Sequence, residues 1–163
     1  SERLRNLYRE IIKNMQHVET DLEIIKEDLR EASLAHGAFF CEYEVFKHIY
    51  RLQARAAVRT GQSVFLLLLT VSDMEGQIPA VNLLNNSMDR LHDCLLHSLR
   101  RNDVVSRFSA TQFVVMLSSL SFENGLMVQD RILGRFKREN PRMAVQIHPK
   151  LLPMDPICIL DPF

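Results

Sequence analysis

One apolar run, from Val64 to Val71, constrains the fold of this chain more than any other segment. It follows a break at Thr60-Gly61-Gln62 and precedes a polar stretch from Ser72 to Gln77. The run is too short to span a membrane, and it lacks the alternation of a half-exposed strand. It is therefore predicted to form a buried central strand of a sheet.

Apolar spacing and turn residues predict further elements around this strand. We expect helices over about 42–59, from about Pro79 to Leu99, and after Ser121, whose side chain can cap the last helix. We expect hairpin strands at about 103–108 and 112–118, and a half-exposed strand beginning at Met143. The proline-rich tail is predicted to be largely irregular, with at most one short edge strand.

From Val64 onward the predicted order is β-α-β-β-α-β. This is the split βαβ, or ferredoxin-like, arrangement of an α+β fold, in which an antiparallel sheet carries helices on one face. The arrangement is shared by proteins of many activities, so it does not by itself predict a function.

The first 34 residues contain no Gly or Pro and carry a heptad pattern. Two interpretations are open: a coiled-coil stalk that forms a homodimer, or an amphipathic segment of one or two helices packed on its own domain. Thr20 and Glu23 fit a capping box, which allows a helix to restart there, and His36-Gly37 fits a helix stop. We therefore divide the chain into a helical segment, 1–36, and a domain, 37–163. The seam residues are Leu4, Tyr8, Ile11, Met15, Val18, Leu22, Ile25 and Leu29.

The composition excludes several classes of protein. With 163 residues, 47% of them apolar, and a net charge of zero, the chain offers no bulk charge for nucleic acid or an anionic membrane. Cys41, Cys94 and Cys158 are widely spaced and odd in number, which indicates reduced thiols in a cytoplasmic protein. The chain begins within a helical pattern, so we expect it to be part of a longer protein.

The stretch RRNDVVSRFSATQFVVML, residues 100–117, reads as a β-hairpin whose tip holds no Gly, Asn, Asp or Pro. Its flanks resemble the signature hairpin of GGDEF domains, the diguanylate cyclases, whose nucleotide-cyclase-like fold has the element order given above. In that resemblance Ser109 and Ala110 stand at the two glycine positions, Thr111 and Gln112 at the two acidic positions, and Phe113 at the phenylalanine.

The resemblance implies a reaction between two GTP molecules that needs divalent metal held by carboxylates from the tip and from the end of the central strand. At that strand end the usual Asp-x-Asp is Thr70-Val71-Ser72 here, so both sources of charge are neutral. Asp73 follows one residue late and is expected on the opposite face of the strand. We therefore expect a degenerate GGDEF-like domain with no catalytic residues, no metal and no cofactor, and not an enzyme.

Arg100 and Asp103 form an Arg-x-x-Asp pattern five residues before the tip. In the family that this chain resembles, such a motif binds cyclic di-GMP, so one hypothesis is a receptor for cyclic di-GMP or another nucleotide. The alternative is an ordinary ion pair at a helix–strand junction.

Lys47, Arg51, Arg55 and Arg59 recur every four residues on the helix over 42–59. This basic stripe could meet phosphates or an acidic partner, or simply form a solvated face. The leading helical segment followed by residues 37–61 also looks similar to the C-terminal part of bacterial transcriptional regulators that carry a winged helix and a bacterial transcriptional activator domain. The leading hypothesis is thus a regulatory or dimerising domain, with any DNA-binding domain outside this chain and no direct nucleic-acid binding by the chain itself.

Overall fold

The computed structural model describes residues 1–30, 37–118 and 121–155. The chain divides into two compact units, Ser1–Ala35 and His36–Phe163, and each is described by itself. None of the helices in the described ranges combines the length and hydrophobicity that a membrane crossing requires.

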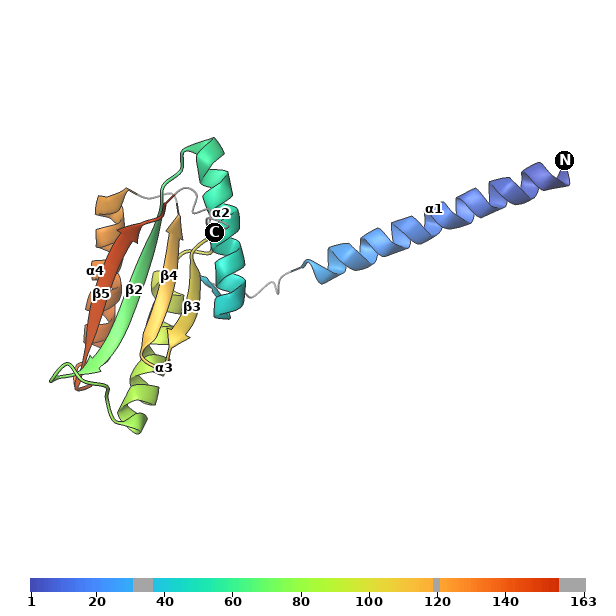
Figure 1. The fold of residues 1–163 in the computed structure, drawn as a ribbon. Helices are drawn as coiled ribbons and strands as arrows, with labels where there is room; N and C mark the ends of the chain where they lie inside the picture. Colours follow the sequence, from blue (N-terminus) through green and yellow to red (C-terminus); the bar gives the residue numbers. More distant parts are fainter. Residues whose placement is uncertain (31–36, 119–120, 156–163) are drawn as a thin grey trace, which may run out of the picture. The chain divides into compact units, whose positions relative to one another are not determined.

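The second unit is built on a five-stranded sheet with the order β1-β3-β4-β2-β5 (Figure 1). Each pair of neighbours among β2 to β5 is antiparallel, and with α3 and α4 these strands confirm the predicted β-α-β-β-α-β order. A short strand that the sequence did not predict, β1, pairs in parallel with β3, so the sheet is mixed. The elements are β1 (Phe39–Cys41), α2 (Tyr43–Thr60), β2 (Val64–Asp73), α3 (Val81–Ser98), β3 (Val104–Ser109), β4 (Gln112–Ser118), α4 (Phe122–Glu139) and β5 (Val145–Pro153).

β5 is longer than predicted, because it continues through two prolines. Pro149 pairs with Leu69 and Pro153 with Phe65, so the strand follows β2 over nearly its whole length. β5 lies at the edge of the sheet, where a proline that lacks an N–H does not interrupt a second ladder. The chain was expected to be irregular after Ile147, and this expectation was wrong for residues 148–153, which belong to β5. Residues 156–163 lie outside the described residues.

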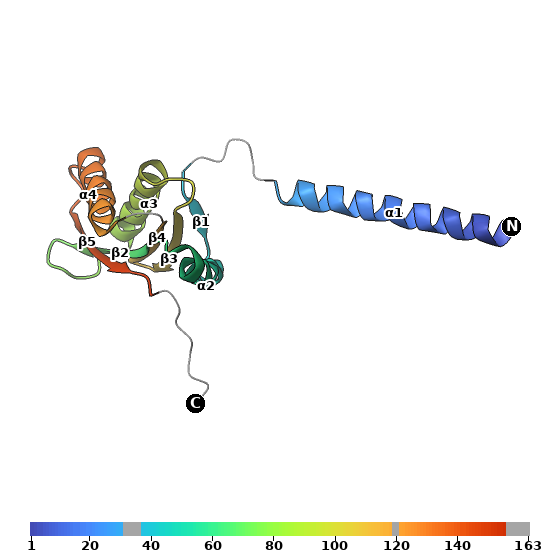
Figure 2. The same ribbon diagram turned by 90° about the horizontal axis from the view of Figure 1, so that it is seen from above.

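Helices cover both faces of the sheet, contrary to the expectation of one face. α3 and α4 lie on one side and α2 on the other, as the view from above shows (Figure 2). The face under α3 and α4 holds the main core, in which Leu67, Leu69, Leu91, Leu95 and Ile132 are all fully buried. On the opposite face Phe46 and Ala54 of α2 pack in a smaller cluster with residues of β2, β3 and β4. This second face is only partly covered, and Leu66 and Leu68 of β2 are half-buried there.

Over its described residues, 1–30, the first unit contains a single helix, α1 (Glu2–Asp28), capped by the Ser1 hydroxyl, which accepts from the Leu4 N–H. The helix runs through Thr20 without a break, because the Thr20 hydroxyl donates to the Gln16 carbonyl and caps nothing. α1 ends at Asp28 and continues through Thr20, so the predicted restart was wrong, whereas the predicted stop at His36-Gly37 borders residues 31–36, which lie outside the described residues. No residue of α1 is buried, and the seam residues are 50–77% exposed.

Gly37 has a structural role of its own in the second unit. Its φ of +72° is unfavourable for other residues, and a Cβ there would collide with the main-chain carbonyl of Leu96 in α3. A glycine is therefore required where the chain enters β1 beside α3.

Candidate functional site

The hairpin tip is a two-residue turn, Ala110–Thr111, closed by hydrogen bonds within the tip. The Ser109 hydroxyl donates to Gln112 Oε1 at 2.9 Å, and the Thr111 N–H donates to Ser109 Oγ at 3.3 Å. Arg107 donates to the carbonyls of Ser109 and Ala110 at 3.3 and 3.1 Å. Polar side chains thus satisfy the turn in place of the conformational freedom that glycines would supply.

The strand end and the tip, singled out separately in the sequence, are neighbours in the structure. Thr70 and Gln112 are register partners of β2 and β4, and Gln112 Nε2 donates to Thr70 Oγ1 at 3.1 Å. The Val71 N–H also donates to the Thr111 carbonyl, at 2.8 Å. One position from each of the two sources of carboxylates that the resemblance implies, the tip and the strand end, therefore takes part in a neutral side-chain hydrogen bond.

Ser72 and Asp73, at the end of β2, are also engaged in local contacts. The Ser72 hydroxyl, which is buried, donates to the Asp73 carbonyl at 2.9 Å, and His148 Nε2 lies 2.7 Å from its oxygen. Because the Ser72 hydroxyl already donates to the main chain, this pair lacks the serine-to-histidine hydrogen bond through which a histidine base activates a nucleophile. Asp73 caps the following turn, since its Oδ1 accepts from the N–H groups of Glu75 and Gln77.

His148 is the residue of this cluster that the sequence did not bring to notice. β5 alternates, with residues 146, 148 and 150 exposed, and Thr70 pairs with His148 across the sheet. The alternation alone could have placed His148 on one face, but only the register of β5 against β2 places it beside Ser72.

The residues present do not fit the magnesium site that the resemblance implies. Mg²⁺ is a hard cation that is usually bound through one or two carboxylates, and the donors gathered here are hydroxyls, an amide and an imidazole. Within residues 1–30, 37–118 and 121–155, no group of three or more His, Cys, Asp or Glu side chains is placed to hold a metal ion.

Arg100 and Asp103 contact each other at the junction of α3 and β3. Asp103 Oδ2 accepts from the Arg100 N–H at 2.8 Å and lies 3.8 Å from Arg100 Nε. The Arg100 guanidinium, about half exposed, also donates to the Ser118 carbonyl at 2.8 Å. The Asp103 carboxylate is almost completely buried, so its position favours the structural interpretation of this motif. Binding of a nucleotide by these two residues stays a prediction.

The environment of Asp103 affects its protonation. Burial raises the pKa of the Asp103 carboxyl above its ordinary value, although the Arg100 N–H and guanidinium oppose this. Oδ1 of this carboxylate has no hydrogen-bond partner among the described residues. The ionised form is therefore held in an unfavourable setting inside the domain.

The two cysteines of the described residues are free thiols. Cys94 is buried in the main core, Cys41 is half-buried, and burial raises the pKa of both thiols. A raised pKa leaves less of the reactive thiolate, so neither cysteine has the character of a nucleophile. Cys158 lies outside the described residues.

Comparisons with known proteins agree on the fold. The sequence matches no protein-family model and no curated protein. Many solved structures resemble it, among them the following three. A DGC protein from Thermotoga maritima has a TM-score of 0.57 at 15% identity, covering 72% of this chain and 84% of its own. The GGDEF domain of DgcB from Caulobacter crescentus, in complex with c-di-GMP, has a TM-score of 0.58 at 10% identity, covering 78% and 81%.

The third structure contains the coiled coil and GGDEF domain of the same Caulobacter crescentus protein. It has a TM-score of 0.56 at 12% identity and covers 94% of this chain and 84% of its own. At such identities the likeness establishes the fold and not the chemistry. The second unit therefore has the nucleotide-cyclase-like fold of GGDEF domains, as the hairpin flanks and the element order predicted.

Proposed function

We propose that this chain is a non-catalytic, degenerate GGDEF-like domain that serves regulation and dimerisation in a bacterial signalling or transcription-regulating protein. The fold is that of diguanylate cyclase domains, and the proposal concerns what this chain does with it. A DNA-binding domain, if the likeness of residues 37–61 to transcriptional regulators holds, belongs to a part of the protein outside this chain.

The hydrogen bond between Gln112 and Thr70 is the observation that carries the non-catalytic part. Joining two GTP molecules requires negative ligands for metal at this point, because metal ions must neutralise the charge of two triphosphates. A neutral amide and a hydroxyl supply no such charge, and their side chains already bind each other. Ser109 and Ala110 also place side chains where the main chain would have to approach a phosphate closely.

The exposed seam of α1 supports the dimerising part. A 27-residue helix with no buried residue leaves a continuous apolar stripe in water, which is unfavourable unless another helix covers it. A second copy of α1 is the simplest cover, because a heptad seam is complementary to itself. The solved neighbour that contains a coiled coil and a GGDEF domain is consistent with this use of the segment.

An assay with GTP tests the non-catalytic part. The purified chain, incubated with GTP and Mg²⁺ or Mn²⁺, is expected to yield no cyclic di-GMP by chromatography. Gln112→Ala serves as the matched control, because it removes the side chain at the tip and leaves a contaminating enzyme unaffected. Product from the native chain that disappears in Gln112→Ala would contradict the proposal.

A further inference from the structure

A groove lies between α2 and the partly covered face of the sheet, and its volume is about 800 Å³. On this side the described residues of the second unit place only α2, which lies beside β3, so within that unit no helix covers this face of β2 and β5 (Figure 2). Pockets for small organic ligands in proteins typically enclose about 300–1,000 Å³ and are lined mainly by apolar side chains. The groove is therefore of a suitable size for a small molecule.

The floor of the groove is aliphatic and comes from three strands. Its side chains alternate out of the sheet on the α2 side, where the main core cannot cover them. Leu66, Leu68 and Val114 are half-buried, and Leu152 at the edge is 50% exposed. These four residues form a floor that remains in contact with water in the absence of a ligand.

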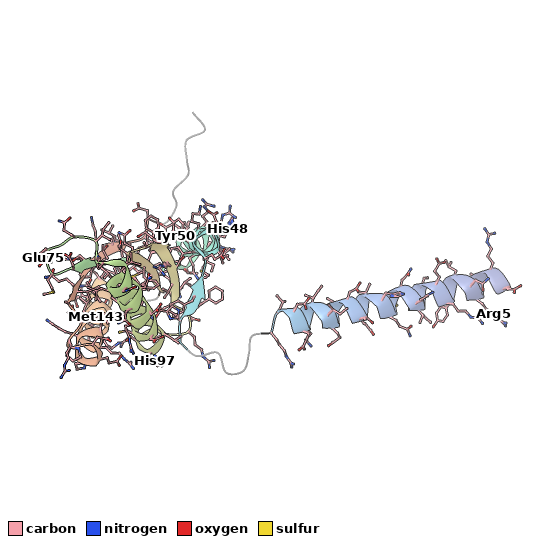
Figure 3. The ribbon with its side chains drawn as sticks, turned by 90° about the horizontal axis from the view of Figure 1, so that it is seen from below. Arg5, His48, Tyr50, Glu75, His97 and Met143 are labelled. Atoms are coloured by element: carbon pink, nitrogen blue, oxygen red, sulfur yellow. The ribbon has the colours of Figure 1, made fainter. Side chains whose placement is uncertain are left out.

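Aromatic side chains form one wall. Tyr43 meets Phe108 edge to face at a centroid distance of 5.0 Å and stacks with Phe46 at 6.2 Å. Val104 of β3 packs on the α2 face, and Phe108, four residues further along the strand, lies on the same face by strand alternation, next to a register irregularity between Arg107 and Ser109. Tyr50 also lines the groove, and Figure 3 shows it on the side of α2 that faces the strands, with His48 on the outer side.

Four cations and no anion border the groove: Lys47, Arg51, Arg55 and Lys150. Lys47 is bound to Glu44 at 2.7 Å and lies over the Tyr43 ring. Arg51, Arg55 and Lys150 form no ion pair with any described residue. The basic stripe predicted on this helix thus borders a cavity at three of its four members, and only Arg59 lies outside it.

We propose that this groove binds an amphipathic organic anion, with an apolar body against the sheet and a carboxylate or phosphate group beside Arg51, Arg55 and Lys150. Charge complementarity selects an anion, because three unpaired cations gather at the rim of an apolar cavity. The lining contains no Asp, Glu, Asn, Gln, Ser or Thr side chain that could read the edge of a base. A fatty or aromatic acid therefore fits better than a nucleotide.

The test uses the full chain and two probes, the aromatic sulfonate 8-anilinonaphthalene-1-sulfonate and laurate below its micellar concentration. The sulfonate is expected to become fluorescent on binding, and laurate to displace it, whereas dodecyltrimethylammonium of equal chain length does not. Arg51→Ala with Arg55→Ala is expected to weaken laurate binding by about tenfold or more, since each lost charge-assisted contact changes affinity by that order. Arg59→Ala, one turn further along α2 and outside the groove, is the matched control and is expected to bind laurate as the native chain does.

NMR of the native chain provides a measurement that does not depend on any variant. Titration with laurate is expected to shift amide signals of α2, β2 and β5 around the groove and to leave those of α3 and α4 unchanged. Equal displacement by the cationic detergent, or shifts confined to the α3–α4 face, would overturn the proposal. So would displacement by GTP or cyclic di-GMP when laurate has no effect, because that outcome assigns the groove to a nucleotide.

Discussion

Two glycines with the same backbone conformation differ in what surrounds them, and this difference can be measured. Gly37 and Gly61 have φ of +72° and +67°, but only Gly37 faces another main-chain segment, at Leu96. We expect Gly61→Ala to lower the free energy of unfolding by about 1–2 kcal/mol, the ordinary penalty of a left-handed residue with a Cβ. Gly37→Ala should cost about 2–4 kcal/mol, because the collision with Leu96 adds to that penalty.

Urea unfolding of the two glycine variants beside the native chain measures this difference. Equal losses in both would mean that the chain around Gly37 moves away from α3 at little cost. The close approach of Gly37 to Leu96 would then contribute nothing to the difference in the free energy of unfolding.

The buried Asp103 carboxyl predicts a pH dependence with a definite sign. Its pKa is raised in the folded domain, so the folded state holds a proton more readily than the unfolded chain. Above the pKa of the folded state, the buried carboxylate is charged and its destabilising effect is fully present. As pH falls through that pKa toward the ordinary value of about 3.9, the carboxylate takes up a proton and the destabilisation is lost. Relative to Asp103→Asn, which cannot titrate, the native chain should therefore gain stability between pH 7.5 and pH 4.5.

Chemical unfolding of both chains at the two pH values measures this difference. Asp89→Asn, at an exposed position of α3, controls for the loss of one negative charge. A native chain that instead loses stability relative to Asp103→Asn on acidification would indicate that the contacts with Arg100 outweigh burial.

At the scale of elements, the heptad seam of α1 predicts which substitutions weaken self-association of the chain. Ile11 and Val18 lie on the seam, whereas Ile24 lies one residue before the seam residue Ile25 and faces outward in the heptad. Ile11→Lys and Val18→Lys should each weaken self-association by about tenfold or more, because burying one such side chain contributes about 1.5–3 kcal/mol. Ile24→Lys should leave the association unchanged, because Ile24 is as exposed as the seam residues in the single chain (54%) but lies outside the heptad seam.

Sedimentation velocity over a range of concentrations measures this association. A native chain that stays monomeric at all concentrations would contradict the coiled-coil interpretation. Equal weakening by Ile24→Lys would contradict the register.

Element type could be predicted from the sequence wherever a periodic pattern was long. The spacing of Leu84, Leu91 and Leu95 marks α3, and the apolar run of β2 is buried as expected on its α3–α4 face. β1 is only three residues long and has no period to detect. The predicted strand ended before Pro149, whereas β5 continues, because a proline interrupts a central strand but not necessarily an edge strand.

The candidate site shows a different limit of the sequence. The tip and the strand end could each be found from the resemblance, and both lie where the predicted element order places them. Their direct hydrogen bond, and the contact of His148 with Ser72, depend on long-range register between strands. The side of the sheet on which α2 lies also could not be predicted from the sequence. Apolar periodicity shows that a helix has an inner face, but it does not show which surface that face covers.

At the scale of the whole molecule, the two units imply that folding and association are coupled in the first and independent in the second. A helix of 27 residues with no buried residue lacks the packing of its amphipathic face, which supplies most helical stability in proteins. The second unit has its own core between the sheet and the α3–α4 pair and needs no partner to retain it.

We therefore expect helical content to fall on dilution, as dimers dissociate and α1 frays, while the core of His36–Phe163 stays folded. Far-UV circular dichroism at concentrations above and below the dissociation constant measures the first effect. Near-UV signals of the aromatic residues, all but one of which belong to the second unit, follow the second. If association stabilises α1 alone, mass action requires the far-UV signal to fall on dilution while the near-UV signal stays unchanged. Helical content that is unchanged at a concentration where sedimentation finds only monomer would mean that α1 is stabilised within one chain, and the exposed seam would then need another explanation.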